Sequence, residues 1–139
     1  MSRFVLDASV ALAWFVDKPQ APYALEIRRR LIAGARAVVP SLWHLEMANG
    51  FALAERRRAF TPTETHEYLA ELESLLGTCI DTEVDVPSLR ELVGSAIALR
   101  LSAYDAVYLS IAQRLALPLA TLDRDLQTAA DTAGVPVIS

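Results

Sequence analysis

The sequence predicts an α/β domain built around a parallel sheet of four to five strands. Short apolar runs alternate along the chain with longer segments of helical periodicity, which is typical of strands joined by helical crossovers. The apolar runs are continuous rather than alternating, as expected for strands covered on both faces. At 139 residues the chain has the size of one domain, residues 1–139, and can bury a substantial core.

Five short apolar runs are the expected strands. They are residues 3–6, 37–39, 79–81, 117–121 and 135–138. Pro40 ends the second run, because proline cannot donate to a following ladder position. If the first and fourth strands are neighbours, the residues that follow both of them lie at the same edge of the sheet.

Seven segments between the strands carry helix signals. They are residues 8–16, 21–33, 41–58, 62–77, 87–99, 103–115 and 123–133. Thr61 and Glu64 have the spacing of a capping box, with Pro62 in the first turn. Gly34 and Gly134 follow two of the helices, where a left-handed residue commonly ends a helix.

Charge and cysteine content limit the possible functions. The net charge of −4 argues against a long basic face that binds duplex nucleic acid. It leaves open an enzyme that binds a few phosphates next to a metal ion, and arginines do cluster at residues 28–30 and 56–58. Cys79 is the only cysteine, so no disulfide forms within the chain, and we expect it to be a small buried residue in a reducing compartment.

The amino terminus and the hydrophobic segments favour a cytoplasmic protein that does not enter a membrane. Asp7 interrupts the apolar start, which therefore does not resemble a signal peptide. No apolar run approaches the roughly 20 residues that a helix needs to cross a bilayer.

Two aspartates directly follow expected strands. Asp7 follows the first strand and Asp123 follows the fourth. The carboxyl ends of parallel strands are where α/β folds bind ligands. An alternative is that each aspartate caps the helix that follows it, since aspartate is a favoured N-cap residue. Asp125 is a possible further acid, but we interpret it as a solvated residue in a first helical turn.

Glu46 lies in an apolar context on the helix that starts at Ser41. The residues expected to form the buried face of this helix are Leu42, Leu45, Ala52 and Leu53. Glu46 and Asn49 flank that row, and a buried glutamate is unfavourable unless it is paired or bound to a metal. The alternatives are a salt bridge or a position at the edge of a groove.

Asp105 stands in the first turn of an apolar helix. Ser102 and Asp105 also fit a capping-box pattern, which would explain the aspartate without a function. Together, however, Asp7, Glu46, Asp105 and Asp123 can converge on one end of the sheet. Two carboxylates about 5 Å apart repel by roughly 3 kcal/mol at an effective dielectric near 20. Such a cluster takes up protons or binds a cation, and carboxylate oxygens suit Mg²⁺ or Mn²⁺ better than zinc. His44 and His66 lack zinc-ligand spacing.

Four short motifs resemble those of the PIN-domain family, and their order resembles VapC-type toxins of VapBC toxin–antitoxin systems. They are Val5-Leu6-Asp7-Ala8-Ser9, Leu45-Glu46-Met47-Ala48-Asn49, Ala103-Tyr104-Asp105-Ala106 and Thr121-Leu122-Asp123. No single motif is specific, whereas the four in this order are, and the resemblance covers essentially the whole chain.

The resemblance implies a three-layer α/β/α sandwich and a Mg²⁺-dependent endoribonuclease, with Mn²⁺ as a possible alternative ion. It implies that Asp7, Glu46, Asp105 and Asp123 are the catalytic and metal-binding residues. Ser9, Asn49 and Thr121 match the supporting polar positions. The expected partners are an RNA substrate, a cognate antitoxin that neutralises the enzyme, and a second copy of the chain in a homodimer.

Other interpretations fit the sequence less well. A haloacid-dehalogenase-like phosphatase would carry a second aspartate where this chain has Ser9, and a phospho-receiver domain would need a lysine near its end, whereas Lys18 is the only lysine. A non-catalytic PIN-like binding module would not need the acids. Aromatic residues Trp14, Phe15, Trp43 and Phe51 could form a partner groove or pack in the core. Arg100 and Arg124 could steer phosphate groups or simply be solvated.

Overall fold

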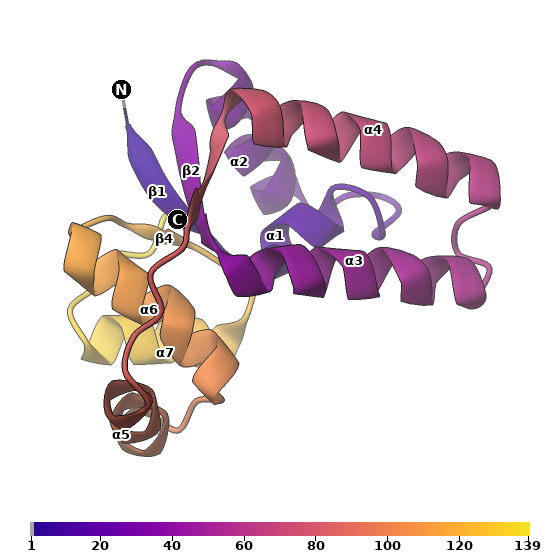
Figure 1. Ribbon diagram of the computed structural model, residues 1–139. Helices are drawn as coiled ribbons and strands as arrows, with labels where there is room; N and C mark the ends of the chain where they lie inside the picture. Colours follow the sequence, from indigo (N-terminus) through magenta and orange to yellow (C-terminus); the bar gives the residue numbers. More distant parts are fainter. Residues whose placement is uncertain (1) are drawn as a thin grey trace.

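A computed structural model describes residues 2–139 and shows a central parallel sheet with helices on both sides (Figure 1). The strands are β1 (Arg3–Leu6), β2 (Arg36–Pro40), β3 (Ile80–Glu83) and β4 (Leu119–Ala120). Their order in the sheet is β3-β2-β1-β4, and all three pairings are parallel. The predicted three-layer α/β/α architecture is confirmed.

The first and fourth strands are neighbours, as the convergence of the acids requires. Val5 pairs with Leu119 and Leu6 with Ala120. The fifth strand expected at residues 135–138 is reduced to a single parallel bridge between Leu119 and Val137. Pro136 has no N–H to donate, so a continuous ladder cannot form on that edge.

The helices follow the predicted segments closely. They are α1 (Ala8–Ala13), α2 (Pro22–Ile32), α3 (Ser41–Arg56), α4 (Pro62–Thr78), α5 (Leu89–Leu99), α6 (Ala103–Leu115) and α7 (Arg124–Thr132). The capping box at the start of α4 is present, since the Glu64 N–H donates to Thr61 Oγ1 and the Thr61 N–H donates to Glu64 Oε1. The main difference is α1, which was expected to reach residue 16 and ends at Ala13.

The buried face of α3 differs from the prediction. The buried residues are Trp43, Met47, Phe51 and Ala54. By contrast, Leu45 is 70% exposed and Ala52 is also exposed. Both rows have helical spacing, and the row with two large aromatic rings is buried because it removes more apolar area from water.

The four aromatic residues that could have formed a groove pack in the core instead. Trp14, Phe15, Trp43 and Phe51 are all buried, so the idea of an aromatic partner groove is wrong. Phe15 and Phe51 meet edge to face with 5.2 Å between ring centroids, which packs the turn after α1 against α3. Cys79 is buried, as predicted.

Half of the exposed large apolar residues lie on α5 or directly before it. They are Val84, Val86, Leu89, Val93 and Ile97, whereas Leu25, Ile32, Leu45, Leu69 and Tyr104 are exposed elsewhere. No residue of α5 is buried within residues 2–139. A helix of eleven residues is marginal without tertiary burial, so this apolar stripe, Leu89–Val93–Ile97, is available to a partner.

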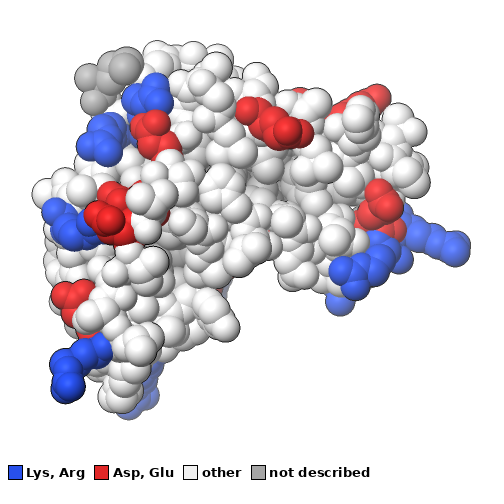
Figure 2. All heavy atoms as spheres, viewed as in Figure 1, with Lys and Arg blue, Asp and Glu red and all other residues white. Residues whose placement is uncertain are grey.

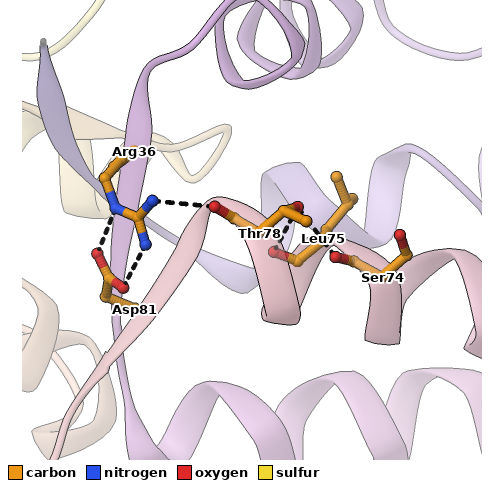
Figure 3. Close-up of polar contacts among 5 residues, drawn as sticks. All are labelled: Arg36, Ser74, Leu75, Thr78 and Asp81. Carbon is orange, nitrogen blue, oxygen red and sulfur yellow. Dashed lines mark hydrogen bonds and ion pairs between the residues drawn. The ribbon is translucent and has the colours of Figure 1, made fainter.

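An arginine–aspartate pair joins β2 to β3 at the amino end of the sheet (Figure 3). Arg36 Nε and Nη2 donate to the two oxygens of Asp81 at 2.9 and 2.7 Å. Arg36 Nη1 also donates to the carbonyl of Thr78 at 2.9 Å, which satisfies one of the free carbonyls at the end of α4. The guanidinium holds the pKa of Asp81 below its usual range.

Among residues 2–139, no single helix is long and apolar enough to cross a membrane. Helices α5 and α6 reach the required length and hydropathy only together, and they are bent by 103° relative to each other.

Candidate active site

The structure gathers the four predicted acids at the carboxyl end of the sheet. Asp7 follows β1 and Asp123 lies just beyond β4, while Glu46 is on α3 and Asp105 is in the first turn of α6. Their charges act on one another: Asp7 and Asp105 raise the pKa of Glu46, and Asp7 and Asp123 raise the pKa of Asp105. Four elements that are distant in sequence therefore contribute to one acidic cluster.

Asp7 is the most deeply buried member of this cluster, with 5% of its surface exposed. Its Oδ2 accepts hydrogen bonds from Ser9 Oγ at 2.6 Å and Thr121 Oγ1 at 2.7 Å. Although Asp7 occupies the N-cap position of α1, its side chain makes no capping hydrogen bond, so the capping alternative does not explain it. Burial raises the pKa of Asp7 and the charge of Asp123 raises it further, against the opposing effect of the two hydroxyls.

Ser9 and Thr121 connect Asp7 to the loop that follows β4. Ser9 Oγ accepts from the Leu122 N–H at 3.0 Å, and Thr121 Oγ1 accepts from the Asp123 N–H at 3.0 Å. Each hydroxyl thus accepts from the loop and donates to Asp7. Asn49, the third polar residue singled out in the sequence, is exposed, and its side chain makes no hydrogen bond with the described part of the chain.

Glu46 is held by a residue that the sequence analysis missed. Its Oε1 accepts a 2.5 Å hydrogen bond from Tyr108 Oη, and Tyr108 is fully buried. Burial raises the pKa of Glu46, and Asp7 and Asp105 add to the effect, while the Tyr108 hydroxyl opposes it. Burial and the neighbouring Glu46 raise the pKa of Tyr108 far above its usual value, so the phenol remains a donor. Glu46 forms no salt bridge within residues 2–139, which leaves the predicted pairing alternative without support.

The Asp105 carboxylate has no cationic partner among the described residues. Ser102 Oγ accepts from the Asp105 N–H at 3.1 Å, but the Asp105 side chain does not return the bond, so the capping box is incomplete. Burial first, then the charges of Asp123 and Asp7, raise the pKa of Asp105 from 3.8 to about 6. This carboxyl therefore titrates close to neutral pH.

Asp123 is partly used for capping, as the alternative interpretation proposed. Its Oδ1 accepts from the backbone N–H groups of Asp125 and Leu126 at 2.9 and 3.1 Å and so caps α7. Its second oxygen accepts no hydrogen bond from the residues described. Asp125 is exposed in the first turn of α7 and adds a small upward contribution to the pKa of Asp105.

The carboxylate oxygens of the cluster are the kind of ligand atoms that a divalent-cation site uses. Within residues 2–139 no arginine or lysine forms a salt bridge with these four acids, so their charge is not compensated by the protein. His44 Nε2 forms a hydrogen bond with Thr82 Oγ1. The atoms that remain to bind a metal ion at this end of the sheet are therefore carboxylate oxygens. Carboxylate oxygens of this kind fit Mg²⁺ or Mn²⁺. Among the described residues, no three of these carboxylates lie close enough together in this structure to form a ready-made coordination sphere.

A mainly apolar pocket of about 410 Å³ extends from Ser9 along the α1–α3 contact. It is lined by Leu12, Val16 and Leu53 and reaches Arg57 at its far end. A larger pocket of about 530 Å³, between the β3–α5 connection and α6, contains none of the four acids, so size alone does not locate the candidate site.

The surface on the side shown in Figure 2 carries its charged side chains mainly toward the margins. Charges of both signs meet between the β3–α5 connection and α6, where Arg114 Nη1 lies 3.9 Å from a carboxylate oxygen of Glu83 and 3.8 Å from one of Asp85.

Comparisons with known proteins agree with the architecture. The PIN domain family matches residues 4–132. Among solved structures, the chain is similar to PAE2754 from Pyrobaculum aerophilum, with 21% identity, a TM-score of 0.69, and coverage of 92% of this chain and 84% of that one. It is also similar to a domain of a functionally unknown protein from Methanocaldococcus jannaschii (17% identity, TM-score 0.59, 99% and 90% coverage).

A third similar structure is FitAcB from Neisseria gonorrhoeae, with 18% identity, a TM-score of 0.61, and coverage of 98% of this chain and 96% of that one. At these identities the likeness concerns the fold. No curated protein matches the chain significantly.

Proposed function

Because the chain belongs to the PIN-domain family, we propose that it is a Mg²⁺- or Mn²⁺-dependent endoribonuclease that hydrolyses RNA phosphodiester bonds and acts as the toxin of a toxin–antitoxin pair. PIN domains are typically metal-dependent nucleases. The observation that carries the proposal is the cluster of Asp7, Glu46, Asp105 and Asp123, in which burial and the neighbouring acids raise the pKa values of Asp7, Glu46 and Asp105, and which has no cationic partner in the described chain.

Each acid has a distinct part in the proposed site. Asp7 and Asp105 would hold the principal ion, since Asp7 is fixed by two hydroxyls and Asp105 forms no salt bridge within the described residues. Glu46 and Asp123 would complete the site directly or through water, each with one oxygen already held by the protein. When bound, the ion lowers the pKa of water and offsets the charge that develops on the phosphate oxygens.

The hydroxyls of Ser9 and Thr121 orient the cluster. Both donate to Asp7 Oδ2, which directs the other carboxylate oxygen away from them and limits its rotation. Because the same hydroxyls accept from the Leu122 and Asp123 N–H groups, they also fix the loop that carries Asp123. Such outer contacts commonly change metal affinity or activity by roughly 10–100-fold.

The choice of RNA and the toxin role rest on the resemblance of the four motifs to VapC-type toxins. A cognate antitoxin would neutralise the enzyme by covering the acids, and the apolar pocket that begins at Ser9 offers a contact next to them. Co-purification with the product of a small neighbouring gene would support an antitoxin partner. The proposal of an antitoxin would be contradicted if the chain is harmless when produced alone and never copurifies with such a product.

A homodimer is the second proposed assembly. The exposed stripe Leu89–Val93–Ile97 supports self-association, because a second copy would cover residues that the chain itself leaves in water. Light scattering should give twice the chain mass for the wild type and one chain mass for Ile97→Lys. An unchanged mass in the variant would place the contact elsewhere.

The decisive test is cleavage of a panel of cellular RNAs with and without Mg²⁺ or Mn²⁺. Asp7→Ala and Asp105→Asn should each abolish metal-dependent cleavage while the variants remain folded. Asp81→Asn, an acid at the opposite end of the sheet, is the matched control and should cleave like the wild type. Undiminished cleavage by the first two variants contradicts the assignment, and a wild type that binds no metal supports a non-catalytic binding module.

A further inference from the structure

We propose that Tyr108 is a positioning residue that holds the Glu46 carboxylate toward the acidic cluster and thereby sets the affinity of the site for its divalent cation. This inference rests on the proposed metal site. It assigns to Tyr108 an action through Glu46, without contact to the substrate or the ion.

The first argument is the way in which Tyr108 connects two elements of the cluster. Tyr108 lies on α6 three residues after Asp105, so the two residues are neighbours on the helix surface. Its hydroxyl crosses to α3 and donates to Glu46 Oε1 at 2.5 Å, between residues that are 62 positions apart in the chain. Helix α6 therefore supplies one acid of the cluster and also fixes the orientation of a second.

The second argument is that Glu46 has little else to hold it in place. It is a long side chain at the edge of the core, and the nearby charges of Asp7 and Asp105 repel it. No arginine, lysine or histidine within residues 2–139 pairs with it, and Tyr108 is its one side-chain hydrogen-bond donor in the described chain. Without the hydroxyl, we expect the carboxylate to turn toward water, away from the other acids.

The third argument concerns what the hydrogen bond leaves free. A short bond to a carboxylate is among the stronger neutral-to-charged contacts, and the buried ring of Tyr108 cannot rotate away. The bond uses Oε1 only, so Oε2 of Glu46 remains available to an ion or to a bound water. This is the arrangement by which outer residues commonly orient metal ligands.

The chain supplies a matched control in a second tyrosine–glutamate hydrogen bond. Tyr68 Oη donates to Glu64 Oε2 at 3.3 Å, and both residues lie on α4, outside the acidic cluster. Tyr68→Phe and Tyr108→Phe remove the same atom and the same type of contact. They differ in whether the glutamate belongs to the cluster.

The test measures Mn²⁺ binding by isothermal titration calorimetry, with the unfolding temperature in EDTA as the check on folding. We expect Tyr108→Phe to weaken Mn²⁺ binding by about 10-fold or more, the usual scale for an outer residue, and Tyr68→Phe to leave it unchanged. Equal Mn²⁺ affinities of Tyr108→Phe and the wild type would overturn the proposal.

A double-mutant cycle separates positioning from a general structural effect. In a Glu46→Gln background, Tyr108→Phe should have no further effect on Mn²⁺ affinity, because the carboxylate on which it acts is gone. An equal loss in both backgrounds would show that Tyr108 acts through the core and would overturn the inference. If Asp7→Asn binds Mn²⁺ as tightly as the wild type does, the proposed metal site itself is wrong. That outcome is distinct from a failure of the Tyr108 inference alone.

A second variant keeps the proposal testable if Tyr108→Phe does not fold. Glu46→Asp retains the charge but withdraws the carboxylate from the Tyr108 hydroxyl by one methylene. Weaker Mn²⁺ binding by Glu46→Asp supports positioning through this bond. An unchanged Mn²⁺ affinity contradicts it, because the reach of the carboxylate would then be irrelevant.

Discussion

Aspartates stand at both ends of the sheet, and their surroundings are opposite. At the amino end, Asp81 accepts two hydrogen bonds from Arg36, and its pKa is lowered (Figure 3). At the carboxyl end, Asp7 and Asp105 face other acids, and their pKa values are raised by burial and by the neighbouring charges. The same side chain is thus compensated at one end and left uncompensated at the other.

Under the proposed function, this difference separates a structural aspartate from the acids of the active site. A compensated aspartate holds adjacent strands together and gains nothing from an added cation. An uncompensated cluster destabilises the folded protein until protons or a cation neutralise it, and such perturbed groups at the carboxyl edge of an α/β sheet are typical of functional sites. Four experiments test this contrast, and the first is the one expected to change the protein most.

Asp105→Asn should produce the largest change. Removal of a metal-binding carboxylate should lower metal-dependent RNA cleavage by about 100-fold or more. The same variant should unfold at a higher temperature than the wild type in EDTA, because it removes a charge that Asp123 and Asp7 disfavour. Cleavage assays and thermal unfolding in EDTA test both parts. A variant that loses activity and is also less stable would mean that Asp105 supports the fold.

The acids at this end could be predicted from the sequence because each follows a recognisable element. Asp7 follows a strand that was found with its correct limits, and the pairing of β1 with β4 brings Asp123 to the same edge. Strand order itself was an assumption, since it depends on long-range packing that local periodicity does not encode. The fifth strand was overpredicted for a local reason, the missing N–H of Pro136.

Metal addition should have the second largest effect. At an Mn²⁺ concentration 100 times the dissociation constant, binding to the folded state alone stabilises a protein by about 2.7 kcal/mol, which corresponds to roughly 10 °C for a domain of this size. Asp81→Asn should show the same rise as the wild type, whereas Asp7→Asn should show almost none. A similar rise in all three proteins would indicate non-specific binding.

Tyr108 and the buried face of α3 show where sequence reasoning ended. Tyr108 was hidden within an apolar helix, where a tyrosine usually packs in the core. Its spacing from Asp105, one helical turn, was the available signal. The rows of Leu45 and Met47 have the same period, and only the packing of the aromatic rings decides that Met47 is buried while Leu45 is 70% exposed. Periodicity therefore predicts that a helix forms, but it does not always predict which face of the helix is buried.

The pH dependence of stability should have opposite signs at the two ends. Asp105 has a pKa of about 6 in the folded protein, against its ordinary value of 3.8. Its contribution to stability is therefore fully present below pH 3.8 and is lost as the pH rises through about 6. We expect the free energy of unfolding in EDTA to fall by roughly 1 kcal/mol over this interval, after allowance for solvent screening. Asp7 and Glu46 act in the same direction because their pKa values are also raised.

Urea titrations between pH 4 and pH 8 in EDTA measure this effect. Asp105→Asn should flatten the fall, and Mn²⁺ affinity should increase over the same interval as the carboxyl loses its proton. The prediction fails if the free energy of unfolding rises with pH in the wild type and the Asp105→Asn variant behaves in the same way. Acids held in ion pairs would then dominate the pH dependence of stability.

Asp81→Asn should have the smallest effect. The lowered pKa of Asp81 means that its pairing with Arg36 contributes stability above pH 3.8, and this contribution is lost as the pH falls through the lower folded value. The side chains of the pair are 36% and 46% exposed, and exposed ion pairs contribute little, so we expect the unfolding temperature at pH 7 to fall by about 3 °C or less. High salt should reduce the difference between variant and wild type, because it screens an exposed pair. Thermal unfolding at low and high salt is the measurement. A loss of Mn²⁺ binding in Asp81→Asn would remove the contrast, since it would mean that the two ends of the sheet are coupled.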